Sequence, residues 1–240
     1  MTGVSLAVST VIFALRSSGR YGEDEAERAL WLPLVRRIRE PYDGLWALPG
    51  GPLGAAQGLA EAATDTLART TGLAPRYLEQ LYAFGDPDRG GAGGAAAAER
   101  VVSIVYWALV GDEEARAARI GQNVRWFHAD ELPTLAFDHN LIVEYALWRL
   151  RNKVEYGRIA SAFLGETFTL AQLREVYEAV LGKSLDPANF RRQIEATGAL
   201  VDTGEVLTGG RHRPPRLYRY NTTVDLADQG PLGTAREKKK

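Results

Sequence analysis

Residues 45–73 read LWALPGGPLGAAQGLAEAATDTLARTTGL, a run of glycines and prolines followed by a run of small and apolar residues. In the second run, apolar side chains recur at helical spacing from Leu59 to Ala68, and Gly72 follows where a helix C-cap belongs. The first run, with Pro49 and Gly51, punctuates the chain before this helix. The segment therefore predicts a loop that leads directly into an amphipathic helix.

Short apolar runs flank this loop and helix on both sides. Their length and their β-branched content are typical of strands. The predicted strands are Val4–Leu15, Leu30–Val35, Tyr77–Phe84 and Val101–Val110. Strands interleaved with a helix predict an α/β (α+β) class, with an α/β/α sandwich in the first half. Residues 90–98, GGAGGAAAA, have nothing to bury and are predicted to form a mobile loop.

The pattern changes to helix after the middle of the chain. Thr169 and Gln172 form an N-terminal capping box, and Asp186 is an N-cap residue followed by Pro187 at the first helical position. The predicted segments are helices at 138–153, 154–164, 169–181 and 186–197 and extended strands at 200–207 and 216–220. Short helices followed by a two-stranded ribbon are the pattern of a winged helix-turn-helix domain.

Charge divides between the two halves of the 240-residue chain, although the net charge of the whole is −1. Residues 1–150 carry 14 Lys and Arg against 19 Asp and Glu, a net charge of −5, whereas residues 151–240 carry 15 against 11, a net charge of +4. We therefore predict an acidic domain at 1–150, a basic domain at 151–225 that suits a polyanion, and a flexible tail at 226–240.

Composition excludes several classes of protein. The chain has no cysteine, which excludes a disulfide framework, a zinc ribbon and thiol catalysis. Residues 4–15 lack the basic region and the cleavage site of a signal peptide, and no uncharged apolar run reaches the ~18 residues of a membrane span. Since 45% of the residues are hydrophobic, the chain can bury a core. We expect a folded, soluble, cytoplasmic protein with no membrane partner.

The segment 45–73 resembles a Nudix box, whose motif runs Gly, five residues, Glu, seven residues, then Arg-Glu-aliphatic-x-Glu-Glu-x-Gly-aliphatic. Gly51, Leu67, Gly72 and Leu73 keep the frame of that motif. In the enzymes that it resembles, helix carboxylates hold Mg²⁺ against a pyrophosphate, whereas a guanidinium repels a divalent cation. The resemblance implies a Nudix-like domain that binds a nucleotide diphosphate without cleaving it, with no catalytic residue, metal or cofactor. The non-acidic residues at the four glutamate positions are Gln57, Thr66, Arg69 and Thr70.

Two acids in the same helix leave an alternative open. Glu61 and Asp65 lie four residues apart and offer a different pair of carboxylates for residual hydrolysis, or they are solvated surface acids. Arg69 likewise has two interpretations: an exposed helix residue, or a planar fork that contacts the phosphates of the ligand.

The helix at 187–198, PANFRRQIEATG, has the features of a DNA-recognition helix. Phe190 and Ile194 are four residues apart and are predicted to face the domain core. An outward face of Asn, Arg and Gln can contact base edges, and a basic, proline-containing wing suits phosphates or a minor groove. The predicted DNA-binding residues are Asn189, Arg191, Arg192 and Gln193 on the helix, and Arg211, Arg213 and Arg216 in the wing.

Taken together, the degenerate Nudix box, FDHNLIVEYALWRLR (137–151), FTLAQLREVYEAVLGKSLDPANFRRQI (168–194) and RPPRLYRY (213–220) resemble the Nudix-related transcriptional regulators of the NrtR family. The resemblance implies a homodimer that senses ADP-ribose or a related adenine nucleotide and represses genes of NAD biosynthesis or salvage. Its partner is a near-palindromic double-stranded operator, because one winged helix contacts only a few base pairs. The alternatives are an active ADP-ribose pyrophosphatase with a helical appendage and a protein-interaction module.

The same resemblance indicates where the nucleotide binds. An arginine just before the box commonly faces phosphate or ribose in Nudix proteins, and the FGDPDR segment (84–89) and the triplet at 137–139 match the regulator family. Trp46 and Phe84 either stack on an adenine or belong to the core, and Asp138 either caps the following helix or contacts the ligand. The predicted ligand-binding residues are Arg36, Arg37, Trp46, Arg69, Phe84, Arg89 and Ser103.

Overall fold

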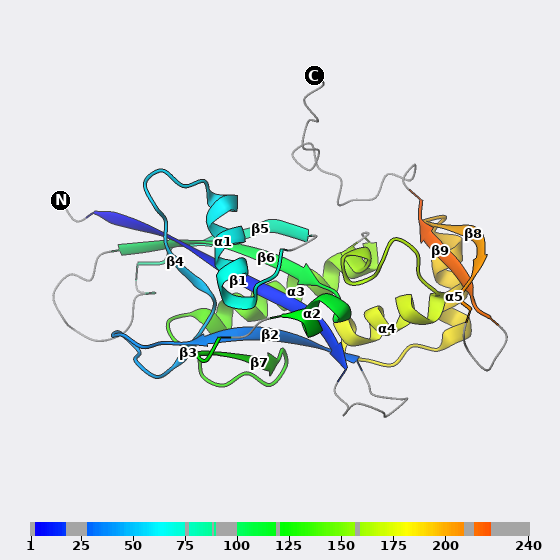
Figure 1. Cartoon of the computed structure of the whole chain (residues 1–240), viewed down its shortest axis with the longest axis horizontal. Coiled ribbons are helices and arrows are strands. Elements are labelled where there is room, and N and C mark those ends of the chain that lie inside the picture. The colour runs from blue at the N-terminus through cyan, green and yellow to red at the C-terminus, as the bar shows by residue number, and fades with distance from the viewer. Residues whose placement is uncertain are drawn as a thin grey trace, which may run out of the picture. The chain divides into compact units, whose positions relative to one another are not determined.

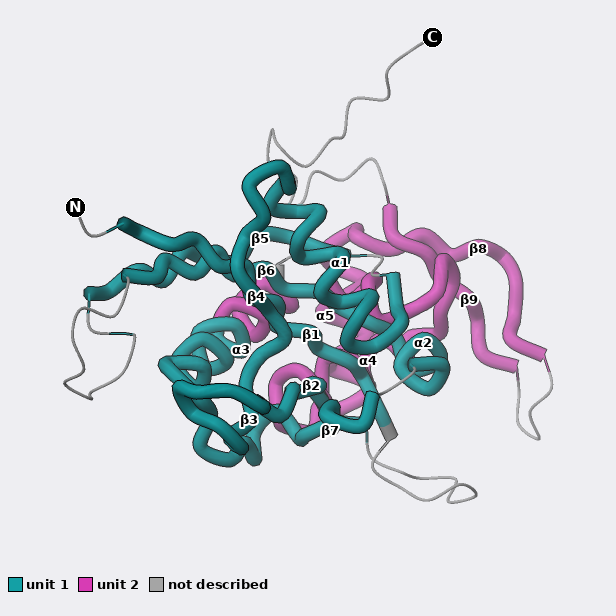
Figure 2. The backbone as a smooth tube through the Cα atoms, turned by 60° about the vertical axis from the view of Figure 1, so that its left-hand side comes forward, with its two compact units in different colours: residues 1–148 teal, residues 149–240 magenta. Residues whose placement is uncertain are grey.

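The computed structural model describes residues 3–17, 28–74, 77–87, 89, 100–118, 121–156, 159–208 and 214–221. The chain forms two compact units, residues 1–148 and residues 149–240, which Figure 2 shows in different colours. Within the described residues, no helix is both long enough and apolar enough to cross a membrane. The predicted loop at 90–98 and the predicted tail at 226–240 lie outside the described residues.

A seven-stranded mixed sheet forms the centre of the first unit (Figure 1). Its strands are β1 (Val4–Ser17), β2 (Arg28–Arg36), β3 (Trp46–Ala47), β4 (Gly50–Pro52), β5 (Tyr77–Phe84), β6 (Arg100–Val110) and β7 (Val124–His128). The main path runs β3-β2-β1-β6-β5, with β4 paired to β1 and β7 paired to β2. Among these described strands, only the β1–β6 pair is parallel. β1 and β6 are also the longest strands, and they lie side by side within the sheet.

Helices cover this sheet. Leu67 of α1 (Leu59–Thr71) is fully buried and packs in one cluster with Ile12 of β1 and Ala108 of β6. The short helix α2 (Asp112–Ala117) follows β6. Figures 1 and 2 show α1 and the start of α3 (His139–Tyr156) on opposite faces of the sheet. The predicted α/β/α sandwich is confirmed.

The loop before α1 approaches β1 closely. β4 pairs with β1 so that Gly50 lies opposite Ser9 and Gly51 opposite Val8. A Cβ atom at Gly50 would lie 2.7 Å from the carbonyl oxygen of Val8, closer than such atoms can approach. Glycine is therefore required at position 50, and its absent side chain lets the loop lie directly against the strand.

The second unit has the winged-helix order of elements. After the 3₁₀ helix η1, the capping box that begins α4 is formed as predicted: the Gln172 backbone N–H donates to Thr169 Oγ1 at 3.2 Å, and the Thr169 N–H donates to Gln172 Oε1 at 2.8 Å. β8 and β9 pair antiparallel as the wing. The elements are η1 (Ile159–Phe163), α4 (Leu170–Leu181), α5 (Pro187–Ala196), β8 (Leu200–Val206) and β9 (Arg216–Tyr220).

The helix predicted at 154–164 is wrong. α3 continues to Tyr156, and residues 159–163 form a 3₁₀ turn instead of an α-helix. The sequence places Gly157 within the predicted span, and a glycine costs about 1 kcal/mol in a helix interior relative to alanine.

Candidate functional site

A pocket of about 380 Å³ lies in the first unit beside the starts of β1 and β6. Residues of β4 and of the turn that begins α3 complete its wall. Three of the predicted ligand residues, Arg37, Arg89 and Ser103, line this pocket together with Phe137 and His139. A volume of this size and a largely apolar wall with a few polar groups are typical of small-molecule sites.

The guanidinium of Arg37 is fixed at the pocket wall. Its Nε donates to the carbonyl oxygen of Pro41 at 2.8 Å, and its Cζ lies 4.7 Å from the centre of the Phe137 ring. Phe137 has a φ of +56°, which is uncommon for a residue other than glycine. Backbone held in this region is found where the surrounding structure imposes it, often at ligand sites.

Arg89 and Asp138 form an ion pair at the same pocket. Arg89 donates from Nε to Asp138 Oδ2 at 2.9 Å and from Nη2 to Oδ1 at 2.7 Å. The two side chains are only 9% and 19% exposed. The sequence left two roles open for Asp138, helix capping and ligand contact. In the structure, both of its carboxylate oxygens accept hydrogen bonds from Arg89.

His139 is a buried neutral imidazole in the pocket wall. The backbone N–H of Leu48 donates to its Nδ1 at 3.0 Å. Burial lowers the pKa of His139 to about 4, an effect that Asp138 opposes and that Arg89 and Arg37 reinforce. With Nδ1 as acceptor, the neutral ring carries its proton on Nε2. The sequence singled out this histidine only as part of the triplet at 137–139.

We expect His139 to make the stability of the first unit depend on pH. Since the folded pKa lies below the ordinary value of 6.5, the unfolded chain binds the proton first, and stability is lost as the pH falls from about 6.5 towards 4. The full difference amounts to ~3 kcal/mol. Urea unfolding, followed by tryptophan fluorescence at several pH values, should show a shallower loss for His139→Gln than for the wild type. Equal pH dependence of the two proteins would contradict this.

Four other predicted ligand residues do not line this pocket: Arg36, Trp46, Phe84 and, as described below, Arg69. Trp46 packs edge-to-face on Phe127 with ring centres 5.0 Å apart, and Phe84 packs on Tyr145 at 6.0 Å. Arg36 donates from Nε to the carbonyl oxygen of Gly44 at 3.2 Å. For the two aromatic residues, these contacts favour the packing role that the sequence left open.

The helix face that corresponds to the acids of the Nudix box carries two threonines and an arginine. Thr66 and Thr70 are buried, and Thr70 Oγ1 donates to the carbonyl oxygen of Thr66 at 2.7 Å. Arg69 is exposed, donates from Nη2 to Thr66 Oγ1 at 3.3 Å, and does not line the pocket described above. This face therefore offers hydroxyls and a guanidinium where carboxylates would be needed.

The two nearby acids have structural partners. Gln57 Nε2 donates to Asp65 Oδ2 at 2.7 Å, and the Gly58 backbone N–H donates to Glu61 Oε2 at 3.2 Å. These contacts tie the preceding loop to α1. Within the described ranges, no group of three or more His, Asp and Glu side chains is placed to hold a metal ion.

In the second unit, α5 exposes the face that the sequence predicted. Asp186 accepts a hydrogen bond from the Asn189 N–H at 2.8 Å, which caps the helix, and Phe190 and Ile194 are buried. Phe190 packs on Tyr177 of α4 at 5.2 Å. The exposed residues include Asn189, Arg191, Arg192 and Gln193. Arg211 and Arg213 lie outside the described residues.

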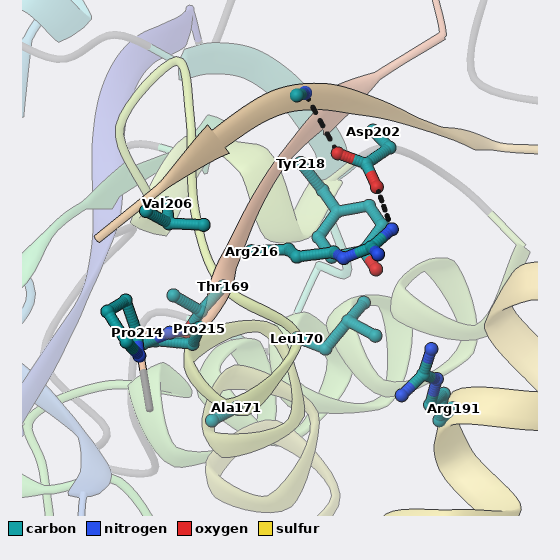
Figure 3. Close-up of a pocket in the computed structure, with 11 residues that line it drawn as sticks. Thr169, Leu170, Ala171, Arg191, Asp202, Val206, Pro214, Pro215, Arg216 and Tyr218 are labelled. Carbon is teal, nitrogen blue, oxygen red and sulfur yellow. Dashed lines mark hydrogen bonds and ion pairs between the residues drawn. The ribbon is translucent and has the colours of Figure 1, made fainter. Parts of the chain in front are cut away.

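A larger pocket, about 870 Å³, lies entirely within the second unit and is lined by α4, α5 and the wing (Figure 3). Arg191 and Arg216, both predicted DNA contacts, line it with Asp202, Pro214 and Pro215. Asp202 was not predicted, because no local motif marks it. The backbone N–H of Gly204 and, next, the side chain of Arg216 hold the pKa of Asp202 below its usual range.

Comparison with known proteins identifies the family to which the chain belongs. The sequence model of the NrtR DNA-binding winged helix domain matches residues 160–220. Over 196 residues, the chain is 31% identical to the "ADPR responsive transcriptional repressor NtrR" of Acinetobacter baylyi, which covers 80% of this chain and 76% of that protein. The chain belongs to the NrtR family. The NrtR structure of Shewanella oneidensis in complex with a 27mer DNA is 32% identical and superposes with a TM-score of 0.68, covering 90% of this chain and 93% of that one.

A further relative is named as an enzyme. The ADP-ribose pyrophosphatase of Methanocaldococcus jannaschii is 32% identical over 117 residues, which are 48% of this chain and 66% of that protein.

Proposed function

We propose that this NrtR-family chain is a transcriptional repressor that binds a near-palindromic operator as a homodimer and responds to ADP-ribose or a related adenine nucleotide. The observation that carries the proposal is the exposed polar face of α5 in a winged-helix unit, beside a pocket lined by two arginines. The similarity to the ADP-ribose-responsive repressor of Acinetobacter baylyi and to the DNA-bound structure from Shewanella oneidensis supports it. The regulated genes are then those of NAD biosynthesis or salvage.

The nucleotide site of this proposal is the pocket of the first unit. Arg37 and Arg89 bring two guanidinium groups to its wall; Asp138 balances the charge of Arg89, and the charge of Arg37 suits a diphosphate. His139 supplies a neutral N–H donor that does not titrate near pH 7. Phe137 supplies an apolar ring beside Arg37. In this proposal, these groups contact the nucleotide directly.

The direct test uses the full chain and no assumed operator. Wild-type protein selects sequences from a random pool of duplex DNA, and light scattering measures its mass free and bound. We expect two-fold related half-sites spaced by about one helical turn, or a multiple of it, and a free dimer. A monomer, or the absence of any selected sequence, would contradict the proposal.

An ADP-ribose pyrophosphatase is the second candidate function, and the Methanocaldococcus relative favours it. The residues of the degenerate Nudix box make this function less favourable. Thr66, Arg69 and Thr70 occupy positions of acidic residues. Asp65, an alternative carboxylate, accepts a hydrogen bond from Gln57. A guanidinium and two hydroxyls cannot replace the carboxylates that hold a divalent cation.

We therefore expect ADP-ribose to bind and to remain intact in the presence of Mg²⁺ or Mn²⁺. Calorimetry measures the binding, and chromatography of the nucleotide after incubation measures the cleavage. The Methanocaldococcus enzyme, assayed in parallel, is the positive control. Turnover at about 1 s⁻¹ or faster would support the pyrophosphatase instead.

A further inference from the structure

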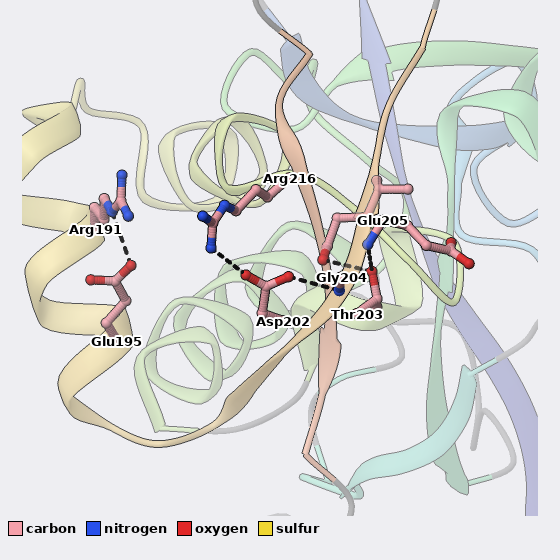
Figure 4. A network of polar contacts seen from close by, with 8 residues as sticks. Arg191, Glu195, Asp202, Thr203, Gly204, Glu205 and Arg216 are labelled. Atoms are coloured by element: carbon pink, nitrogen blue, oxygen red, sulfur yellow. Dashed lines mark hydrogen bonds and ion pairs between the residues drawn. The ribbon is translucent and has the colours of Figure 1, made fainter.

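Two arginines of the proposed DNA surface are already paired with carboxylates of their own unit (Figure 4). Arg191 Nε lies 2.9 Å from Glu195 Oε1, one turn further along α5. Arg216 Nη1 lies 2.8 Å from Asp202 Oδ2, across the two strands of the wing. Both arginines line the pocket of the second unit, and so does Asp202. At each arginine, the local charge of this surface is therefore close to zero.

The Asp202 carboxylate is held in position by the wing itself. Its Oδ1 accepts the backbone N–H of Gly204 at 2.9 Å, and Gly204 has a φ of +79°. This turn lies at an irregularity in the pairing of β8 with β9. Thr203 donates to the carbonyl oxygen of Leu217 at 2.9 Å and thereby ties the same turn to β9. The negative charge is thus built into the surface rather than carried by a loose side chain.

Both ion pairs are open to solvent. The side chains of Arg216 and Asp202 are 65% and 34% exposed, and those of Arg191 and Glu195 are 61% and 45% exposed. Such pairs contribute little to folding stability, so stability does not explain why acids occupy a surface that faces a polyanion. A DNA phosphate would have to displace each carboxylate from its arginine and would then lie beside an unpaired negative charge.

We propose that Asp202 and Glu195 compete with DNA phosphate for Arg216 and Arg191, and so limit the part of DNA affinity that is independent of sequence. This rests on the proposed DNA-binding function. Binding without sequence preference comes almost entirely from arginine and lysine contacts to phosphate. Asp202 and Glu195 pair with Arg216 and Arg191, so they do not compete for the base contacts that Arg192 and Gln193 are proposed to make. The acids thus keep the electrostatic affinity low while the base-reading face stays free to act.

The test is Asp202→Asn, with Glu195→Gln as a second variant. Asparagine keeps the Oδ1 that accepts the Gly204 N–H, so the turn is preserved while the charge is removed. Binding of each full-length protein to a duplex of arbitrary sequence is measured at several salt concentrations. For Asp202→Asn we expect affinity to rise roughly three- to tenfold at low salt, and the slope of log affinity against log salt to steepen by about 0.9, one phosphate contact.

The matched control is Asp112→Asn. It removes the same charge and breaks a similar pair, Arg116 Nη2 to Asp112 Oδ2 at 2.7 Å, in the first unit. We expect the affinity and slope of this control to equal those of the wild type.

Unfolding cannot mimic a gain in affinity. If Asp202→Asn and Glu195→Gln bind like the wild type, or more weakly, the competition is absent and the inference is overturned. A rise of the same size in Asp112→Asn would overturn it too, because overall charge would then explain the effect. If the wild-type chain binds no duplex at low salt, the proposed function itself fails, and the inference fails with it.

Discussion

We expect replacement of Arg89 by methionine to lower the free energy of unfolding of the first unit by about 3 kcal/mol. The substitution leaves the Asp138 carboxylate, 19% exposed, without the two hydrogen bonds that it accepts from Arg89. A charge left unpaired in a poorly hydrated site loses the interactions that compensated its desolvation. Urea unfolding followed by tryptophan fluorescence measures the effect, because all five tryptophans of the chain lie within residues 1–148.

Two further variants separate this explanation from simple loss of packing. Arg191→Met in the second unit breaks an ion pair whose side chains are 61% and 45% exposed, and it should cost no more than ~1 kcal/mol when unfolding is followed by circular dichroism. Adding Asp138→Asn to Arg89→Met removes the stranded charge and should recover part of the lost stability. A double variant that is no more stable than Arg89→Met alone would contradict the account.

Arg192→Ala should weaken binding to the selected operator by about 1–3 kcal/mol, or ~5–150-fold, and relax the preference at one base position. Arg192 is exposed on α5, and its Nη2 donates to Asn189 Oδ1 at 2.6 Å, which orients the guanidinium before DNA arrives. Competition binding against operators changed at single positions measures both effects. Arg116→Ala in the first unit is the control for loss of one positive charge.

If Arg192→Ala binds every changed operator with the wild-type preference, the base-reading surface is misplaced.

The wing is predicted to behave differently. Arg211→Ala and Arg213→Ala, at positions outside the described residues, should weaken binding to all duplexes evenly and flatten the salt dependence.

Capping residues in the sequence predicted where individual helices begin and end. α1 ends at Gly72, whose φ of +71° is the left-handed cap that the sequence indicated, and α4 begins at the predicted capping box. The strands β3, β4 and β7 and the helix α2 were not predicted. They have two to six residues, too few to show a period, and the strands form because β1 and β2 offer partners outside these short segments.

The pocket was predictable only in part, for a related reason. The sequence indicated Arg37 through the resemblance to Nudix proteins and Arg89 and Ser103 through the resemblance to the regulator family, and all three line the pocket. The pairing of Arg89 with Asp138 joins residues 49 positions apart, so no local pattern contains it. Asp202 meets Arg216 because of the register of a wing that includes an irregularity, and that register cannot be read from residue types alone.

The proposed coupling between nucleotide and DNA needs an element that belongs to both units, and α3 is such an element. α3 begins at His139, in the wall of the nucleotide pocket, and continues as a single helix past residue 148, where the first unit ends. A ligand changes DNA affinity only if it binds one arrangement of the DNA-binding units better than another. We propose this helix as the element through which the preference is transmitted.

The most direct test of the whole account is a titration of the protein–operator complex with ADP-ribose, with Mg²⁺ present and the nucleotide analysed afterwards. We predict that saturating ADP-ribose lowers operator affinity about tenfold or more, a coupling of ordinary size, and that the nucleotide is recovered intact. Operator affinity that stays unchanged, at ADP-ribose concentrations that calorimetry shows to be saturating, would contradict the central claim.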